Sequence, residues 1–348
     1  MLNSIVLEGK EICIGYKSKK KPVYIHKNID FTLKKGKLTC LLGANGAGKS
    51  TLLRTLSSTQ PLLGGELILM GKDINSYSEK EISRTVGVVL TEKTQTGGLS
   101  VYELVSLGRQ PHTGFFGRLS KHDNDVIYRA LEAVGISHKA KSYTAELSDG
   151  ERQKAMIAKA LVQECPIILL DEPTAFLDVV SRIEIMTLLH KLAKEEEKAI
   201  LMSTHDIEQA LVLSDYLWLL TSEGLYSGVT EDVILSGKMN TLFPDSEISF
   251  DLMHGVYSPT VKSEKAIILK AENEVLKHWT QNALNREGYL CLEYRQQAEF
   301  LEKHQGIPVI NVISPQKISY TYHGKTELFI NFSELISFII VNFKGCHQ

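Results

Sequence analysis

The first two-thirds of the chain alternates short apolar runs with segments in which apolar residues recur at three- and four-residue steps. The continuous runs predict buried strands, and they are Leu38–Leu42, Glu66–Met70, Ile167–Leu170 and Ala199–Ser203. The periodic segments predict helices, and they are 49–58, 101–110, 122–135, 149–163, 182–196 and 206–214. Strands that alternate with helices indicate an α/β fold with a mostly parallel sheet. The helices within about 95–160 separate two strands, so we expect them to form a helical subdomain.

After Ser236 this pattern weakens, and the turn-rich stretch 241–262 predicts a linker between a domain at 1–240 and a second domain at 263–348. In the second domain, Ser333 could cap the final helix, and the segments around residues 323–325 predict a hairpin. Strands are expected at 266–270, 289–293, 309–313, 317–322 and 326–330, and helices at 275–284 and 295–305. The pattern therefore predicts a small C-terminal α/β domain.

Composition places the chain among ordinary globular proteins. It has 348 residues, 43% of them hydrophobic, and a net charge of −2, which suits about two domains and gives no support for nucleic-acid coating or a polybasic membrane contact. The five cysteines are odd in number and widely spaced, which favours a reducing compartment over disulfides or zinc. Glu8 and Glu11 argue against a signal peptide, and the apolar run 335–343 is too short to span a bilayer. We expect a soluble protein that needs a separate membrane partner for any membrane role.

The segment Gly43–Ser50 (GANGAGKS) fits the pattern G-x-x-x-x-G-K-[ST] between a predicted strand and a predicted helix. Glycines let backbone N–H groups point at phosphate oxygens, and the start of the helix adds its positive end. Lys49 supplies a charge for the β- and γ-phosphates, and the Ser50 hydroxyl suits Mg²⁺. The segment predicts binding of a nucleoside triphosphate with Mg²⁺.

The apolar run Ile167–Leu170 ends in two carboxylates, Asp171 and Glu172. One carboxylate can then lie beside Mg²⁺ and the next beside a nucleophilic water. Asp171 is expected to hold the metal, through a water, and Glu172 to orient or deprotonate the attacking water.

The segment Leu147–Glu151 (LSDGE) resembles the LSGGQ signature of the ATP-binding cassette (ABC) family, with Asp149 and Glu151 as departures. The resemblance covers about residues 3–240 and implies a P-loop NTPase fold that binds ATP and Mg²⁺. It implies that Ser148 and Gly150 contact the γ-phosphate of an ATP held by another copy. By itself, Ser148 also suits a helix N-cap.

The same resemblance assigns further roles. His205 in STHD matches the switch histidine, Asp178 ends the D-loop that couples two nucleotide sites across a homodimer, and Tyr16 is placed on the adenine. Glu172, His205 and Lys49 would be the catalytic residues. The other implied nucleotide contacts are Gly43, Asn45, Gly46, Ala47, Gly48, Ser50 and Thr51.

One family element departs from its pattern. Counting back from Leu99, Thr91 occupies the place of the Q-loop glutamine, with Glu92 and Gln95 as nearby candidates. A threonine there could still bind Mg²⁺ through a water, together with Ser50 and Asp171.

The helical segment 101–123 looks like that of importers for iron–siderophore, haem and vitamin B12, which carry a GR-x-P segment, here Gly108–Pro111. The resemblance implies an ATPase subunit that lies peripherally on the cytoplasmic face of the inner membrane. Its implied partners are integral-membrane permease subunits, a second copy of itself and, indirectly, a substrate-binding protein, with no nucleic acid.

Two other functions remain open on the residues alone. A soluble ABC ATPase of translation or DNA repair is one, although such relatives usually carry two cassettes or long coiled-coil insertions. A P-loop kinase is the other, and the LSDGE segment speaks against it. The domain at 263–348 has no second phosphate-binding pattern and no cysteine–histidine cluster, so we expect it to contribute to regulation or dimer contacts and to perform no catalysis.

Overall fold

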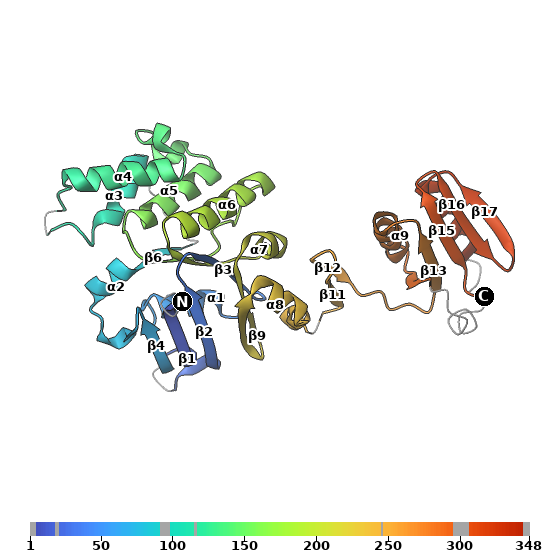
Figure 1. The fold of residues 1–348 in the computed structure, drawn as a ribbon, viewed down its shortest axis with the longest axis horizontal. Coiled ribbons are helices and arrows are strands. Elements are labelled where there is room, and N and C mark those ends of the chain that lie inside the picture. The colour runs from blue at the N-terminus through green and yellow to red at the C-terminus, as the bar shows by residue number, and fades with distance from the viewer. Residues whose placement is uncertain are drawn as a thin grey trace. The chain divides into compact units, whose positions relative to one another are not determined.

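The computed structural model describes two compact units, Met1–Ser258 and Pro259–Gln348 (Figure 1). Each unit has its own hydrophobic core. The described residues are 5–17, 21–90, 98–114, 117–244, 246–294 and 306–343.

The central sheet of the first unit has the strand order β10-β9-β3-β8-β7-β6. Its strands are β3 (Lys37–Leu42), β6 (Val86–Val89), β7 (Ile167–Leu170), β8 (Ala199–Ser203), β9 (Tyr216–Thr221) and β10 (Gly224–Val229). All neighbours are parallel except the β9–β10 hairpin. Every residue of β7 and β8 is buried, as expected for parallel strands covered on both faces. The predicted α/β fold with a mostly parallel sheet is confirmed.

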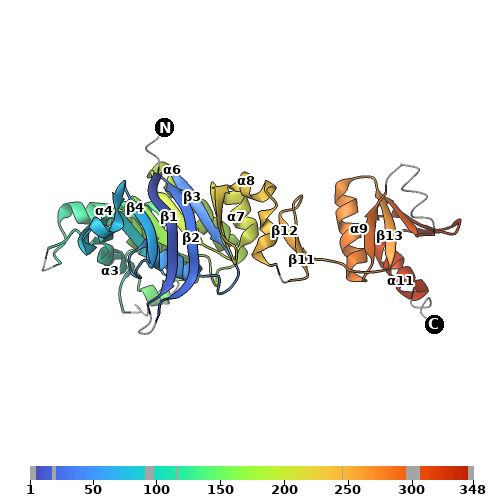
Figure 2. The same ribbon diagram turned by 90° about the horizontal axis from the view of Figure 1, so that it is seen from below.

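A second, antiparallel sheet in the order β2-β1-β4-β5 belongs to the same unit. Its strands are β1 (Ile5–Tyr16), β2 (Val23–Lys34), β4 (Gly64–Leu69) and β5 (Lys72–Asp73); β1, β2 and β4 lie side by side (Figure 2). One apolar core joins this sheet, the helix α1 (Lys49–Leu56) and one face of the central sheet. That packing fixes β1 and β2 near the loop that precedes α1.

Helices cover the rest of the central sheet. They are α2 (Glu79–Thr85), α3 (Val101–Ser106), α4 (Lys121–Ala133), α5 (Asp149–Leu161), α6 (Val179–Glu195), α7 (Ile207–Leu213) and α8 (Thr230–Leu235), with short 3-10 turns η1 (Ile74–Ser76), η2 (Leu107–Arg109), η3 (Ser137–Lys139) and η4 (Thr144–Glu146). Four of them, α2, α3, α4 and α5, begin with a serine and an acidic residue in a reciprocal capping box, which satisfies N–H groups that a helix start leaves unpaired. Among the described residues, no helix is long and apolar enough to cross a bilayer.

Arg109, in η2, is a buried cation that connects α4 to the residues that follow α5. Its guanidinium lies 2.7 Å from Asp123 Oδ1 on α4 and 2.6 Å from Glu164 Oε2, and it donates to the Val162 carbonyl at 2.7 Å. Hydrogen bonds from Ser120, with help from Arg109, lower the pKa of Asp123 to about 2. Beside it, a Cβ on Gly108 would lie 2.1 Å from the Lys159 carbonyl oxygen, so close packing on α5 requires glycine. The Gly108–Arg109 pair is therefore a packing element.

Replacing Arg109 by methionine should destabilise the first unit by about 3–5 kcal/mol, because it leaves the buried carboxylate of Asp123 without its cation. Urea unfolding followed through Trp218, in a Trp279→Phe background that leaves it the only tryptophan, measures the loss. Arg129→Met, at an exposed position of α4, is the control. Equal unfolding free energies for the two variants would contradict the assigned role of Arg109.

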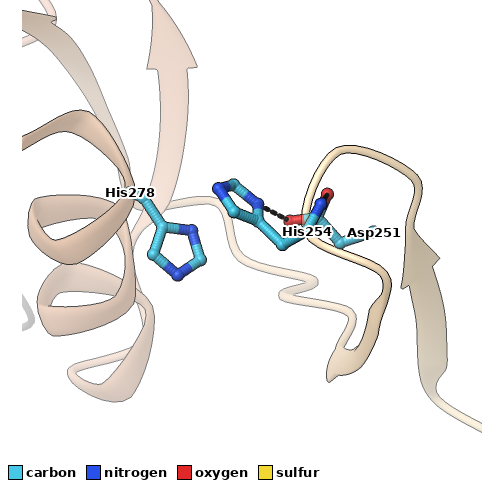
Figure 3. A group of neighbouring side chains, drawn as sticks. All are labelled: Asp251, His254 and His278. Carbon is cyan, nitrogen blue, oxygen red and sulfur yellow. Dashed lines mark hydrogen bonds and ion pairs between the residues drawn. The ribbon is translucent and has the colours of Figure 1, made fainter. Parts of the chain in front are cut away.

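The segment after α8 differs from the linker expected over 241–262. It forms η5 (Lys238–Leu242), β11 (Ile248–Asp251) and β12 (Val256–Pro259), and Phe250 and Tyr257 pack on the core of the first unit with ring centroids 5.1 Å apart. In the turn after β11, the Nδ1 of His254 lies 2.7 Å from Asp251 Oδ2 (Figure 3). Aromatic anchors thus outweigh the turn-rich composition, and the division of the chain falls after Ser258.

The C-terminal unit is a mixed sheet in the order β14-β13-β15-β16-β17. Its elements are β13 (Ala266–Ala271), α9 (Glu274–Arg286), β14 (Leu290–Glu293), β15 (Val309–Ser314), β16 (Lys317–Tyr322), β17 (Lys325–Phe329) and α11 (Phe332–Phe343). β13 pairs in parallel with β14 and β15, and β15, β16 and β17 are antiparallel. The predicted hairpin is present, with His323 and Gly324 at positive φ. The helix expected at 295–305 lies outside the described residues.

Candidate functional site

The residues predicted to bind and hydrolyse the nucleotide follow three adjacent strands and lie at one edge of the central sheet. The order β3-β8-β7 is parallel throughout, so the carboxyl ends of these strands meet at the same edge, where α/β proteins bind ligands. The glycine loop follows β3, His205 follows β8, and Asp171 and Glu172 follow β7.

The glycine loop, residues 43–48, has a backbone that its glycines make possible. Gly46 and Gly48 have φ values of 80° and 97°, which residues with a Cβ rarely adopt. A Cβ on Gly48 would also lie 2.8 Å from Ile25 Cγ2 on β2. Gly43 and Asn45 line a pocket of about 100 Å³ together with Thr204 and His205. The loop is thus folded against β2 and opens beside the end of β8.

Lys49 directly follows the glycine loop in the chain, and its side chain folds back into that loop. Its Nζ donates to the Gly43 carbonyl at 2.9 Å and lies 3.5 Å from His205 Nε2, and the residue is only 6% exposed. Burial lowers the pKa of Lys49, and the carboxylates of Glu172 and Asp171 oppose that shift. A phosphate bound at the loop would favour the charged form of the lysine further.

Asp171, Glu172 and His205 form one hydrogen-bonded group across β7 and β8. Glu172 Oε1 lies 2.7 Å from His205 Nε2. The Ser203 hydroxyl donates to Asp171 Oδ1 at 2.7 Å and accepts from the Glu172 N–H at 2.9 Å. Glu172 has a φ of 49°, in the left-handed region. The predicted catalytic residues Lys49, Glu172 and His205 are therefore in mutual contact through His205.

The oxygen atoms expected to hold Mg²⁺ belong to the same edge. Ser50 is in the first turn of α1, and Asp171 is at the end of β7; hydroxyl and carboxylate oxygens are ligands that Mg²⁺ prefers. The donor set therefore fits this ion. Thr91, the third expected ligand, lies outside the described residues, as do Glu92 and Gln95.

Tyr16 ends β1 beside the start of α1. Its hydroxyl lies 3.0 Å from Thr51 Oγ1, and the residue is 48% exposed. An accessible aromatic ring next to the phosphate-binding loop has the placement that adenine stacking requires. Contact of Tyr16 with adenine stays a prediction.

The signature and D-loop residues form a second cluster. Ser148 caps α5, where Glu151 completes the capping box and lies 3.3 Å from Lys139 Nζ. A Cβ on Gly150 would lie 3.3 Å from the hydroxyl of Ser181 on α6. Asp178 caps α6, and its hydrogen bonds from Ser181 lower the pKa of its carboxyl. The starts of α5 and α6 are therefore neighbours.

Two residues at the site were not found from the sequence. Ser203 lies two residues before His205, in the segment predicted to contain the switch histidine. It is the last residue of β8, which pairs with the strand that ends at Asp171 and Glu172, and this position could have indicated its role. His26, whose Nε2 lies 2.7 Å from the Ala47 carbonyl oxygen, is on β2, a strand that the apolar pattern did not predict.

The fold and the site define a P-loop nucleoside triphosphatase. The family model described as ABC transporter matches residues 26–175. An uncharacterised ABC transporter ATP-binding protein of Methanocaldococcus jannaschii is 34% identical over 268 residues, which cover 76% of this chain and 91% of the relative. This chain belongs to the ATP-binding subunits of ABC transporters, which hydrolyse ATP to power transport.

Two further similarities refine the picture. The iron(3+)-hydroxamate import ATP-binding protein of Bacillus subtilis is 39% identical over 211 residues, covering 61% of this chain and 77% of the relative. A bacterial ABC transporter cassette solved as a dimer superimposes with a TM-score of 0.56 at 26% identity, covering 64% of this chain and 98% of the cassette. The predicted family, fold and ATPase activity are confirmed.

Proposed function

We propose that this chain is the ATP-hydrolysing subunit of an importer that takes up a metal chelate such as iron–siderophore, haem or vitamin B12. The observation that carries the ATPase part is the group formed by Lys49, Asp171, Glu172 and His205 at one edge of the sheet. A buried cation beside two carboxylates and a histidine can hold phosphates and activate a water.

Each residue of the group has a proposed role. Lys49 and the loop N–H groups bind the β- and γ-phosphates, and Glu172 orients the attacking water and accepts its proton. His205, 2.7 Å from Glu172 Oε1, holds that carboxylate in place. Bound Mg²⁺ would neutralise charge on the phosphates, and Ser50 and Asp171 would hold it.

We propose that two copies form the working enzyme. Ser148, Gly150 and Asp178 belong to a cluster distinct from the group around Lys49, which supports their use on ATP held by a second copy. Next to Asp178, the apolar side chains of Val179 and Val180 are 61% and 66% exposed, a surface suited to burial against another copy. The related cassette solved as a dimer supports the same arrangement.

The proposed cargo and location rest on relatives. The Gly108–Arg109 segment, which resembles that of chelate importers, has a packing role in this fold, so support for an iron chelate comes from the relative in Bacillus subtilis. We propose peripheral attachment to integral-membrane permease subunits at the cytoplasmic face of the inner membrane, with a substrate-binding protein acting on the other side. The soluble alternatives are not favoured, because the relatives described above are transporter subunits.

Purification of the tagged chain from membranes tests this function. We expect an integral-membrane permease to co-purify, and the reconstituted complex to take up one of ferric hydroxamate, haem or cobalamin when ATP is supplied. A complex carrying Glu172→Gln should bind ATP and show no uptake. Recovery of the chain with ribosomes or DNA, and without a membrane protein, would support the soluble alternatives instead.

A further inference from the structure

We propose that His26 is a positioning residue for nucleotide binding: it holds one peptide unit of the phosphate-binding loop in the orientation that presents an N–H group to phosphate. His26 lies on β2 and is only 9% exposed, and its Nε2 is 2.7 Å from the carbonyl oxygen of Ala47. This inference rests on the proposed use of residues 43–50 as the ATP site.

The direction of the hydrogen bond follows from its acceptor. A carbonyl oxygen can only accept, so the Nε2 of His26 must carry the proton. A neutral ring with its proton on Nε2 and a cationic ring both satisfy this requirement. The bond therefore acts as a fixed attachment between β2 and the loop.

The bond also fixes the amide group of the next residue. The Ala47 carbonyl and the Gly48 N–H belong to one planar trans peptide, in which they point in opposite directions. With the carbonyl held toward His26, the Gly48 N–H points away from β2. Loops of this kind bind phosphate through such N–H groups.

Without His26, little in the local backbone would prevent this peptide from rotating. Rotation changes ψ of Ala47 and φ of Gly48, and glycine accepts both signs of φ at small cost. Gly48 has a φ of 97°, and the contact of its α-carbon region with Ile25 excludes a residue with a Cβ. A rotated peptide would turn the Ala47 carbonyl oxygen toward the phosphates, where its partial negative charge repels them.

The hydrogen bonds within the loop leave the Ala47 carbonyl to be held by a residue from outside it. The Ala47 N–H donates within the loop to the Ala44 carbonyl at 3.1 Å, and the Gly48 carbonyl accepts from Leu52 in α1 at 2.8 Å. The loop therefore restrains the groups on either side of the Ala47–Gly48 peptide, whereas His26 restrains the Ala47 carbonyl from outside the loop.

The test compares two variants of His26. His26→Phe keeps a planar ring and removes the donor, and His26→Gln keeps a side-chain N–H at a similar reach. We expect the Kd for ADP, measured by calorimetry, to rise about two- to tenfold in His26→Phe, the range that one neutral hydrogen bond represents, and to stay within about twofold in His26→Gln. For ATP, KM should rise and kcat stay within about twofold, because the bond is present in the ground and transition states alike.

His122→Phe, at an exposed position of α4, is the matched control and should leave both constants unchanged. A melting temperature that falls in His26→Phe while Kd is unchanged would overturn the proposal in favour of a packing role, and so would equal losses of affinity in His26→Phe and His26→Gln. If the phenylalanine variant does not fold, His26→Met replaces it as the variant without a donor. Loss of ADP binding in Lys49→Ala together with full binding in His26→Phe would refute this inference alone, whereas full binding in Lys49→Ala would refute the ATP site itself.

Discussion

Replacing Lys49 with alanine should abolish ATP binding at ordinary nucleotide concentrations. The ammonium group is buried within residues 43–48, and it donates to the loop carbonyls of Gly43 and Ala44. Hydrogen bonds from a charged donor contribute about 1.5–3 kcal/mol each, so losing two to the phosphates weakens binding at least about 100-fold. Titration calorimetry with ATP measures the loss.

Lys198→Ala is the control for this substitution. Lys198 is another partly buried lysine whose pKa burial lowers, and its Nζ donates to the Cys165 carbonyl at 3.0 Å, away from the glycine loop. ATP affinity should be unchanged in that variant. An unchanged affinity in Lys49→Ala would instead remove residues 43–50 from the nucleotide site.

Glu172→Gln should retain ATP and lose turnover. The substitution keeps the shape of the side chain and its proximity to His205, and it removes the carboxylate that we propose as the base for the attacking water. A general base contributes about 10²- to 10⁴-fold to the rate, so kcat should fall by that amount while the Kd for ATP changes little. Steady-state phosphate release and equilibrium binding measure the two quantities.

We expect the same variant to accumulate as an ATP-bound dimer, because in the proposed two-copy enzyme ATP is bound by both copies and only its hydrolysis lets them separate. Gel filtration with light scattering in the presence of ATP detects this species. Glu195→Gln, in an exposed pair with Lys191 on α6, should behave like the unmodified chain. A Glu172→Gln protein that stays monomeric with ATP and hydrolyses it at the full rate would contradict the assigned role.

The elements that the sequence predicted correctly are those whose signal is local. The buried strand Ile167–Leu170 is a continuous apolar run that ends in acids, and the loop 43–48 is defined by glycines at fixed positions before a lysine. Both features depend on neighbours in the chain, so one pass along the sequence finds them. The alternation of strands and helices then predicts that β3, β7 and β8 run parallel, whereas the position of β8 between β3 and β7 comes from the structure.

What the sequence did not predict depends on contacts between distant segments. β1 and β2 pair with several register shifts, and such irregularities disturb the alternation that marks a strand. His26 and Arg109 gain their roles from the Ala47 carbonyl and from Asp123, which the sequence alone does not place beside them.

For the final helix, the cap is Asn331, which accepts from the Glu334 N–H at 2.9 Å, and Ser333 lies inside the helix.

The left-handed backbone of Glu172 links stability to activity. A φ of 49° costs a residue with a Cβ about 1–2 kcal/mol, and the hydrogen bond from its N–H to Ser203 helps to hold it there. Glycine or asparagine would tolerate this conformation better, but neither has the carboxylate that we propose as the base for turnover. Selection for a more thermostable enzyme must therefore keep glutamate at this position and act elsewhere in the chain. The same conflict between stability and activity is expected wherever catalysis fixes an unfavourable backbone conformation.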